Sequence, residues 1–396
     1  MDFSPWPYFS DDEIQAVVNV LKSGKINQWT GNEVTAFEEE FSRYIGSDYA
    51  IALANGSLAL DIALLAFNIG KGDEVIVTPR SFVASASCIA LRGAIPVFVD
   101  VDPVSQNITL ETISKAFSSK TKAVIAVNLG GWPCDLKRIK LFCEHHRIVL
   151  IEDCAQAIGA KLDGKRVGTF GDCAIFSFCQ DKIMTTGGEG GMLVTNNRDF
   201  WEKVWSYKDH GKDYNAAFHQ EHKPGFRWLV NSFGTNCRMT EMQAAMGRVI
   251  LRKVDGWVKK RREFASLYNK AFNTIPGLRT TLPEVDVYHS YYKYYVFINQ
   301  NELKLSCNRN DIIDSLNKAG VPCNTGICPE IYREKVFKKG LYKIYDAKKN
   351  KGDSYLPVAR QLGETSIMLM VHPTLMPESI HYVIDQVKLA MERAVR

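Results

Sequence analysis

The stretch "SFCQDKIMTTGGEGGMLVTNN", residues 177–197, decides the fold. Residues 173–178 form an apolar run typical of a buried strand, and residues 191–195 form a second one. A lysine, Lys182, lies between them and is followed by two threonines and a glycine-rich turn. Lysine is rarely buried without a partner. A partly buried lysine between two core strands therefore indicates a chemical role for its amine.

The composition is that of a globular chain with room for a large and a small domain in its 396 residues. Its net charge of +5, from 49 basic and 44 acidic residues, does not indicate a nucleic-acid surface. Residues 1–14 are acidic and do not read as a signal peptide. The best membrane candidate, residues 50–70, is interrupted by polar side chains, so we expect no membrane association.

The ten cysteines are scattered without a close C-x-x-C pair. This pattern predicts reduced thiols and a cytoplasmic protein. The cluster "CEHH", residues 143–146, could suggest a metal site, but adjacent residues do not share one face of a helix. We therefore expect no metal.

Short β-branched runs alternate with helical patterns along the first half of the chain. The expected strands are residues 50–53, 74–78, 96–99, 123–127, 148–151, 173–178 and 191–195. The expected helices between them are residues 57–67, 81–91, 110–117 and 136–146. This alternation predicts an α/β fold with a mainly parallel sheet. Only a loop separates the last two strands, so we expect the sheet to be mixed.

The second half of the chain begins with a long polar and aromatic segment, residues 206–236, of the kind that is functional or disordered. Thr240 and Gln243 then form a capping-box signature, and one long helical pattern follows. We expect a large domain over residues 1–250, with the N-terminal segment near the small domain. A smaller C-terminal α+β domain, residues 251–396, should be joined to it by that helix.

A carboxylate, Asp153, ends the apolar run "RIVLIED". Open α/β sheets bind their ligands at the carboxyl ends of the strands. The alternative is that Asp153 only caps the next helix, which is the commoner role of such a residue. The small residues in "EDCAQAIGA", residues 152–160, leave room for a flat ligand and favour the first interpretation.

A third element, Gly56 and Ser57 in "NGSLAL", opens a helix after a short strand and offers an anion site. The glycine-rich stretches at 168–172 and 186–191 match neither G-x-G-x-x-G nor G-x-x-x-x-G-K-[ST]. A phosphate cradle, a carboxylate at a strand end and a lysine form the set that pyridoxal phosphate needs. Burial would favour a neutral lysine amine, which can attack a carbonyl and shuttle protons.

At these residues the chain resembles the DegT/DnrJ/EryC1/StrS family of pyridoxal phosphate-dependent nucleotide-sugar aminotransferases. The resemblance spans nearly the whole chain. Its most specific blocks are "IEDCAQAIGA", "GTFGDCAIFSFCQDKIMTTGGEGGMLVTNN" and "FGTNCRMTEMQAAMG". The resemblance implies a fold-type I architecture, with a large α/β/α domain and a smaller C-terminal domain.

The same resemblance implies a role for each matching residue. Lys182 matches the lysine that forms the Schiff base, and Asp153 matches the partner of the pyridine nitrogen. Phe82 matches the aromatic residue that stacks on the ring, and Gln156 a residue near the ring's oxygen. The matches to phosphate contacts are Gly56, Ser57, Ser177 and, from the neighbouring subunit, Asn236.

The implied reaction transfers an amino group from glutamate to a nucleotide-linked 4-keto-6-deoxy sugar, with pyridoxamine phosphate formed in turnover. The enzyme is expected to be a homodimer with shared sites, acting in deoxyamino-sugar biosynthesis for O-antigen, another surface polysaccharide or a glycoside. Family members with histidine in place of this lysine are dehydratases, so Lys182 favours transamination. A non-catalytic regulator would not need Lys182, Asp153 and Ser57 together. A nicotinamide enzyme of this fold class would need the G-x-G-x-x-G motif, which the glycine-rich stretches do not match.

The turn "TTGGEGG", residues 185–191, bears on which sugar carbon reacts. It resembles the T-T-G-E-G-G form of family members that act at C4, with one extra glycine, more than the G-A-L-G-D-G-G form of those that act at C3. The resemblance therefore favours C4, with C3 as the alternative. Glu189 in this turn either contacts the sugar or only caps amides of the loop.

Overall fold

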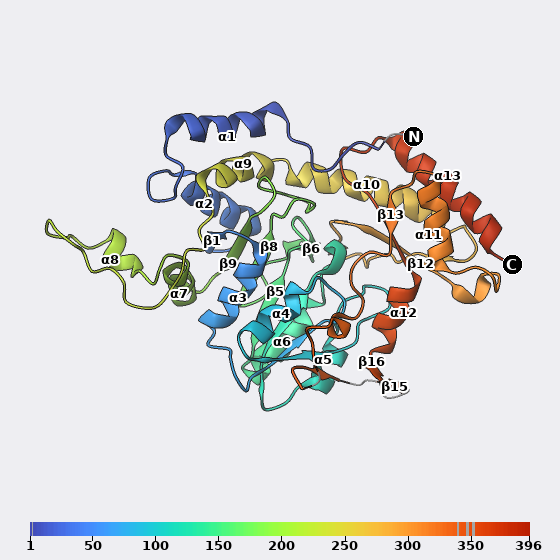
Figure 1. Ribbon diagram of the computed structural model, residues 1–396, viewed down its shortest axis with the longest axis horizontal. Helices are drawn as coiled ribbons and strands as arrows, with labels where there is room; N and C mark the ends of the chain where they lie inside the picture. The colour runs from blue at the N-terminus through green and yellow to red at the C-terminus, as the bar shows by residue number, and fades with distance from the viewer. Residues whose placement is uncertain (2, 339, 346–347, 351–352) are drawn as a thin grey trace.

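An eight-stranded sheet forms the centre of the protein (Figure 1). The computed structural model describes residues 1, 3–338, 340–345, 348–350 and 353–396. In spatial order the strands are β1 (Tyr49–Leu53), β9 (Gly191–Thr195), β8 (Cys173–Ser177), β5 (Val149–Asp153), β4 (Thr121–Val127), β2 (Glu74–Val77), β3 (Ile95–Phe98) and β14 (Lys343–Ile344). Only β9 runs antiparallel to its neighbours; the other pairings in the sheet are parallel.

Helices cover both faces of this sheet. The connecting helices are α3 (Gly56–Ala66), α4 (Ala84–Leu91), α5 (Leu110–Ala116) and α6 (Leu136–His146). The crossovers through α3 and α4 step along the sheet in one direction, whereas those through α5 and α6 step in the other. Because parallel crossovers are right-handed, the two pairs lie on opposite faces. The contacts agree, since α3 packs on α4 and α5 packs on α6.

The prediction of an α/β fold with a mainly parallel, mixed sheet is confirmed. All seven expected strands are present, with ends that differ by at most two residues. The eighth strand, β14, was not predicted, because two residues are too short to show a period of two. It pairs with β3, so the C-terminal part of the chain adds a strand to the large sheet. The domain division at residues 250 and 251 stays a prediction.

The expectation of one long helix after the capping box is wrong. The structure has α9 (Glu241–Leu251) and α10 (Val254–Phe272), with a tight turn between them. There the Lys253 N–H bonds to the carbonyl of Ile250, three residues back. The Lys253 ammonium is also 2.8 Å from the Glu13 carboxylate, which fixes the break against the N-terminal part of the chain.

A second, four-stranded sheet lies beside α10 and the C-terminal helix. It contains β10 (Leu278–Arg279), β12 (Tyr294–Ile298), β17 (Ser366–Leu369) and β13 (Cys323–Asn324), and all three pairings are antiparallel. The same part of the chain contains the helices α11 (Arg309–Lys318), α12 (Pro357–Thr365) and α13 (Pro377–Ala394). A three-stranded sheet contains β11 (Val287–Tyr288), β6 (Lys161–Leu162) and β7 (Lys165–Arg166). A two-stranded sheet contains β15 (Lys348–Asn350) and β16 (Asp353–Tyr355).

The N-terminal part of the chain lies across both halves of the molecule. The helix α1 (Asp11–Ser23) runs along α9, α2 (Glu33–Ile45) packs on β1 and α9, and the first residues lie beside α13 (Figure 1). The Thr374 hydroxyl donates to the carbonyl of Pro5 at 2.8 Å. We call residues 3–6 the N-terminal strap.

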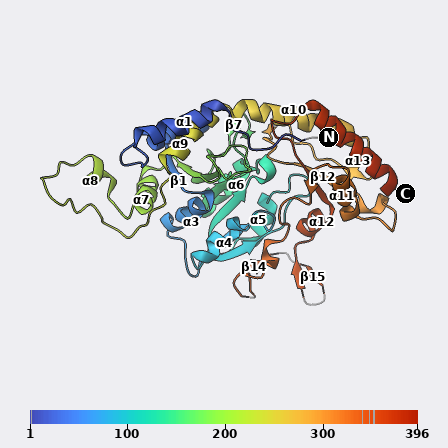
Figure 2. The same ribbon diagram turned by 45° about the horizontal axis from the view of Figure 1, so that its top comes forward.

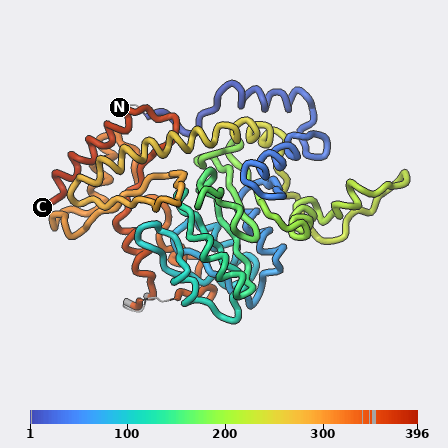
Figure 3. Tube along the Cα trace, turned by 180° about the vertical axis from the view of Figure 1, so that it is seen from behind, coloured from blue at the N-terminus to red at the C-terminus, as the bar shows by residue number. Residues whose placement is uncertain are grey.

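An arm projects at the opposite end of the molecule from α13 (Figures 2 and 3). It leaves the body after α7 (Arg198–Lys208), includes α8 (Tyr214–Phe218) and returns before α9. Four of its aromatic side chains, Phe218, Phe226, Trp228 and Phe233, are exposed, with 83% of Trp228 and all of Phe233 accessible. Among the helices described, none is long and apolar enough to cross a membrane.

Candidate active site

A cavity of about 570 Å³ brings together seven of the eight predicted site residues. We call it the central cavity. The predicted site residues that line it are Gly56, Ser57, Phe82, Asp153, Gln156, Ser177 and Lys182. It lies where β5 ends at Asp153 and β8 ends at Ser177, next to the start of α3 after β1. Because these strands are mutually parallel, their carboxyl ends meet at one edge of the sheet, where such folds place ligands.

Asp153 is a buried carboxylate at this edge, with 3% of the residue exposed. It accepts hydrogen bonds from the Ser85 hydroxyl at 2.8 Å and the Ala155 N–H at 3.1 Å. Burial raises the pKa of the Asp153 carboxyl, and these hydrogen bonds and the charge of Lys182 offset part of that rise. No helix begins directly after β5, so the helix-cap interpretation is wrong. A protonated ring nitrogen is the kind of partner that such a carboxylate would bind.

Lys182 enters the cavity from the loop after β8 and is partly buried. Its ammonium nitrogen lies 4.8 Å from the centroid of the Tyr292 ring. Its backbone carbonyl accepts a hydrogen bond from the indole N–H of Trp6 in the N-terminal strap, at 3.0 Å. Tyr292 also donates to the carboxylate of Asp181, the residue before Lys182. Two aromatic residues from distant parts of the chain therefore surround the lysine.

The start of α3 is shaped to hold an anion. The Asn55 side chain caps the helix by accepting the Leu58 N–H at 2.9 Å, and the exposed Ser57 hydroxyl lies beside it on the cavity wall. A Cβ on Gly56 would come within 2.9 Å of the Cβ of Ser177, so only glycine lets the helix approach β8 this closely. Together with Asp153 and Lys182, these groups fit pyridoxal phosphate, which needs a phosphate cradle, a carboxylate and a lysine.

Phe82 and Gln156 form further parts of the wall. Phe82 is 60% exposed, which leaves a ring face available for stacking. Gln156 is buried, and its side-chain oxygen accepts the Gly130 N–H at 2.9 Å, so its orientation is fixed. Their roles toward a cofactor ring stay predictions.

Asn236, the eighth predicted residue, lies outside the central cavity. It is exposed near the base of the arm, where its side-chain oxygen accepts the Arg238 N–H at 3.3 Å. Its backbone pairs with that of Asp209 in an isolated bridge. The structure therefore does not bring Asn236 to this chain's own site, and its predicted contact with a neighbouring subunit stays a prediction.

The turn after Lys182 is held by its threonines. The Thr185 hydroxyl donates to the Phe178 carbonyl at 3.0 Å and accepts the Gly188 N–H at 3.2 Å. The Thr186 hydroxyl donates to the carbonyl of Glu189 at 2.6 Å. The amide at Gly188 is thus capped by Thr185, while the Glu189 side chain is exposed and lines the central cavity.

The family model for the DegT/DnrJ/EryC1/StrS aminotransferases matches residues 7–388. A curated relative, the dTDP-4-dehydro-2,3,6-trideoxy-D-glucose 4-aminotransferase of Saccharopolyspora spinosa, is 31% identical over 396 residues. The match covers 98% of this chain and 96% of that one.

Two solved structures are similar over nearly the whole chain. An aminotransferase from Psychrobacter cryohalolentis has a TM-score of 0.93 and is 47% identical, covering 98% of each chain. The GDP-4-keto-6-deoxy-D-mannose-3-dehydratase of E. coli, solved with hydrated pyridoxal phosphate, has a TM-score of 0.87. It is 25% identical and covers 97% of this chain and 98% of that one. These matches confirm the predictions of a fold-type I aminotransferase and of pyridoxal phosphate as cofactor. The chain belongs to the DegT/DnrJ/EryC1/StrS aminotransferase family.

Proposed function

We propose that this enzyme transfers an amino group from glutamate to a nucleotide-linked 4-keto-6-deoxy sugar, at C4 of the sugar. The observation that supports it most is the convergence of Lys182, Asp153 and the α3 phosphate cradle on one cavity. The relative from S. spinosa is named for amination of a dTDP-linked 4-keto sugar. The product would serve the synthesis of a surface polysaccharide such as O-antigen, or of a glycoside.

The residues of the cavity have distinct tasks. When bound, pyridoxal phosphate supplies an aldehyde that takes up amino groups and a ring that withdraws electrons. Asp153 holds the ring nitrogen protonated by its negative charge, and Ser57 and Ser177 hold the phosphate. The amine of Lys182, once free, takes the proton from the α-carbon of the amino donor. Phe82 fixes the plane of the ring by stacking.

Amination at C4 is supported by the turn that follows Lys182. Glu189 lines the cavity, and its loop is capped by Thr185, so its carboxylate is available to a sugar hydroxyl. We expect NMR of the product from a panel of nucleotide keto-sugars to show the amine-bearing carbon at C4. An amine at C3 would instead establish the 3-keto sugar aminotransferase, the second candidate.

A dehydratase is the other candidate, because an E. coli dehydratase is among the similar structures. Lys182 favours transamination, since the resemblance gives the dehydratases a histidine at this position. The same panel separates the two reactions: a dehydratase product would have lost a hydroxyl group and gained no nitrogen.

We further propose that the active unit is a homodimer with shared sites. Asn236 is exposed near the base of an arm that carries uncovered aromatic side chains, including Trp228 and Phe233. Exposed apolar side chains gathered in this way are typical of protein interfaces. The resemblance implies that Asn236 contacts the phosphate of the cofactor in the neighbouring subunit. A cytoplasmic location is proposed as well, and the ten cysteines, none of which forms a disulfide, are compatible with it.

A shared site predicts complementation between two inactive variants. We expect Lys182→Ala and Asn236→Ala to be nearly inactive alone, and a mixture of the two to regain up to about a quarter of the wild-type activity, since a statistical half of the dimers are hybrids with one intact site. Subunit exchange is verified by native mass spectrometry. A mixture that stays inactive although hybrids have formed would show that Asn236 does not act across the interface.

A further inference from the structure

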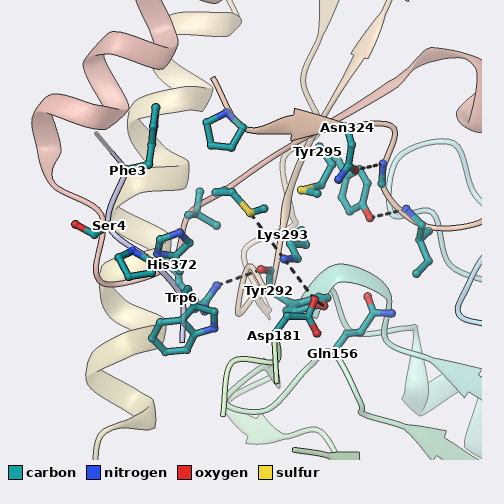
Figure 4. A pocket seen from close by; sticks show the side chains of 18 residues that line it. Phe3, Ser4, Trp6, Gln156, Asp181, Tyr292, Lys293, Tyr295, Asn324 and His372 are labelled. Atoms are coloured by element: carbon teal, nitrogen blue, oxygen red, sulfur yellow. Dashed lines mark hydrogen bonds and ion pairs between the residues drawn. The ribbon is translucent and has the colours of Figure 1, made fainter. Parts of the chain in front are cut away.

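A second cavity of about 540 Å³ adjoins the central cavity (Figure 4). The two share four wall residues: Gln156, Asp181, Tyr292 and Ile327. The N-terminal strap closes the second cavity on one side, and residues of the four-stranded sheet, including Tyr295 and Asn324, close it on another. The second cavity therefore lies directly beside the space that holds Lys182.

The charged groups on the wall of the second cavity are mostly cationic. Lys293 and Arg261 face a single carboxylate, that of Asp181. His372, also on this wall, is neutral at pH 7, because burial and these two cations lower its pKa to about 3. An anion is thus the ligand that would balance this wall.

Lys293 is the cation best placed to contact a ligand. Its side chain is only 15% exposed, and its ammonium lies 3.6 Å from the Asp181 carboxylate and 3.8 Å from the sulfur of Met370. The Asp181 contact is longer than a normal hydrogen bond, and a thioether is a weak acceptor. An ammonium has three N–H donors, so Lys293 lacks good acceptors for them. Burial accordingly lowers the pKa of Lys293.

Arg261 adds a second, buried positive charge to the wall that contains Lys293. It is 1% exposed, and its Nη1 donates to the carbonyls of Tyr291 and Tyr292. Its Nε and Nη2 have no hydrogen-bond partner among the residues described. The Trp6 ring lies over the guanidinium, with 5.1 Å between the Arg261 Cζ atom and the ring centroid, and Arg261 contributes to the cavity wall.

The distance between Lys182 and Lys293 suits a small amino acid. Both ammonium groups lie 4.8 Å from the centroid of the Tyr292 ring, so their separation cannot exceed twice that distance. A donor whose amino group reacts at the position of the Lys182 amine has its carboxylates within a few bonds of that point. This upper bound is of the same order as the span from the amino group of an extended glutamate to a cation that binds its side-chain carboxylate.

We propose that the second cavity binds a carboxylate of the amino donor, with the Lys293 ammonium as its direct partner and Arg261 as the buried charge behind it. This inference rests on the proposed transfer from glutamate. It identifies Lys293 as a residue that selects the donor, distinct from the groups that hold the cofactor.

Glutarate provides a direct test, because it has both carboxylates of glutamate and no amino group to react. Its dissociation constant is measured by calorimetry on the cofactor-loaded enzyme. We expect Lys293→Met to weaken glutarate binding at least about 10-fold, the usual effect of losing a hydrogen bond to a charged group. Lys293→Arg should bind within about 3-fold of the wild type, since the charge is kept. Glutaramide, which is uncharged, should not distinguish the variants.

Lys260→Met is the matched control. Lys260 also lies 4.8 Å from an aromatic ring, that of Phe264, but it does not line either cavity. Its replacement should leave glutarate binding unchanged. If Lys293→Met fails to fold, Lys293→Gln keeps a polar side chain, one atom shorter, and tests the same loss of charge.

Kinetics separate donor binding from sugar binding. Lys293→Met should raise the KM for glutamate at least about 10-fold and change the KM for the keto-sugar less than about 3-fold. Unchanged glutarate binding in Lys293→Met would overturn the inference, as would an effect confined to the sugar. If the wild type aminates no keto-sugar but glutarate binding still depends on Lys293, the carboxylate site stands and the proposed sugar reaction is wrong.

Discussion

Replacing Lys182 with alanine should reduce turnover by about 10³-fold or more, because the enzyme loses both its nucleophile and its proton-transfer group. Sodium borohydride should no longer attach the cofactor to the protein, and mass spectrometry of the intact chain measures this directly. The fold should survive. The ammonium is only partly buried, and its contact with the Tyr292 ring is worth about 1 kcal/mol.

The control for Lys182 is Lys260→Ala, which removes a lysine that lines neither cavity. It should keep full activity and full borohydride labelling. Labelling that persists in Lys182→Ala would assign the covalent attachment to another lysine. Lys293, whose ammonium also lies 4.8 Å from the centroid of the Tyr292 ring, would be the first to examine.

Asp153→Asn should lower kcat/KM by about 10²- to 10³-fold, the usual loss when a buried electrostatic partner is removed. The amide has the shape of the carboxylate and can still accept the Ala155 N–H, so the local structure should be kept. What disappears is the negative charge that keeps the ring nitrogen protonated. Steady-state kinetics together with the absorption spectrum of the bound cofactor measure the effect.

The stability of the same variant gives a second, independent expectation. Burial raises the pKa of Asp153 above its value in the unfolded chain, so the ionised carboxylate costs stability at every pH above its folded pKa. Removing the charge should therefore not lower the melting temperature of the cofactor-free protein at pH 7. Ser85→Ala, which deletes one hydrogen bond but keeps the charge, should cost far less activity. A destabilised but active Asp153→Asn would indicate a structural role.

The parts of the site that the sequence predicts are those placed by strand ends. Asp153 ends one apolar run and Ser177 lies near the end of another, and a parallel sheet brings the ends of its strands to one edge. The position of Lys182 in the cavity follows from the short connection that begins at Ser177. Local pattern and sheet geometry place Asp153 and Lys182 at this edge, whereas the phosphate role predicted for Ser177 comes only from the family resemblance.

The residues that escaped prediction reach the site by tertiary contacts alone. Tyr292 meets Asp181 across 111 residues of sequence, and Trp6 meets Lys182 across 176. Trp6 lies in the proline-flanked "SPWPY", which has no helical or strand period, and Lys293 lies among tyrosines that read as an ordinary strand. The aromatic density of these two segments was the only local signal, and it does not distinguish a core from a site.

The N-terminal strap has a consequence for the order in which the enzyme becomes functional during its synthesis. The strap holds the backbone of Lys182 through Trp6, and it is itself held by Thr374, 369 residues after Pro5. The ribosome synthesises Pro5 and Trp6 early, and it adds Thr374 only 369 residues after Pro5. Contacts so distant in sequence form late, since they close the largest loops. The strap therefore lacks its contact with Thr374 until residue 374 has been synthesised, although Trp6 can meet Lys182 earlier.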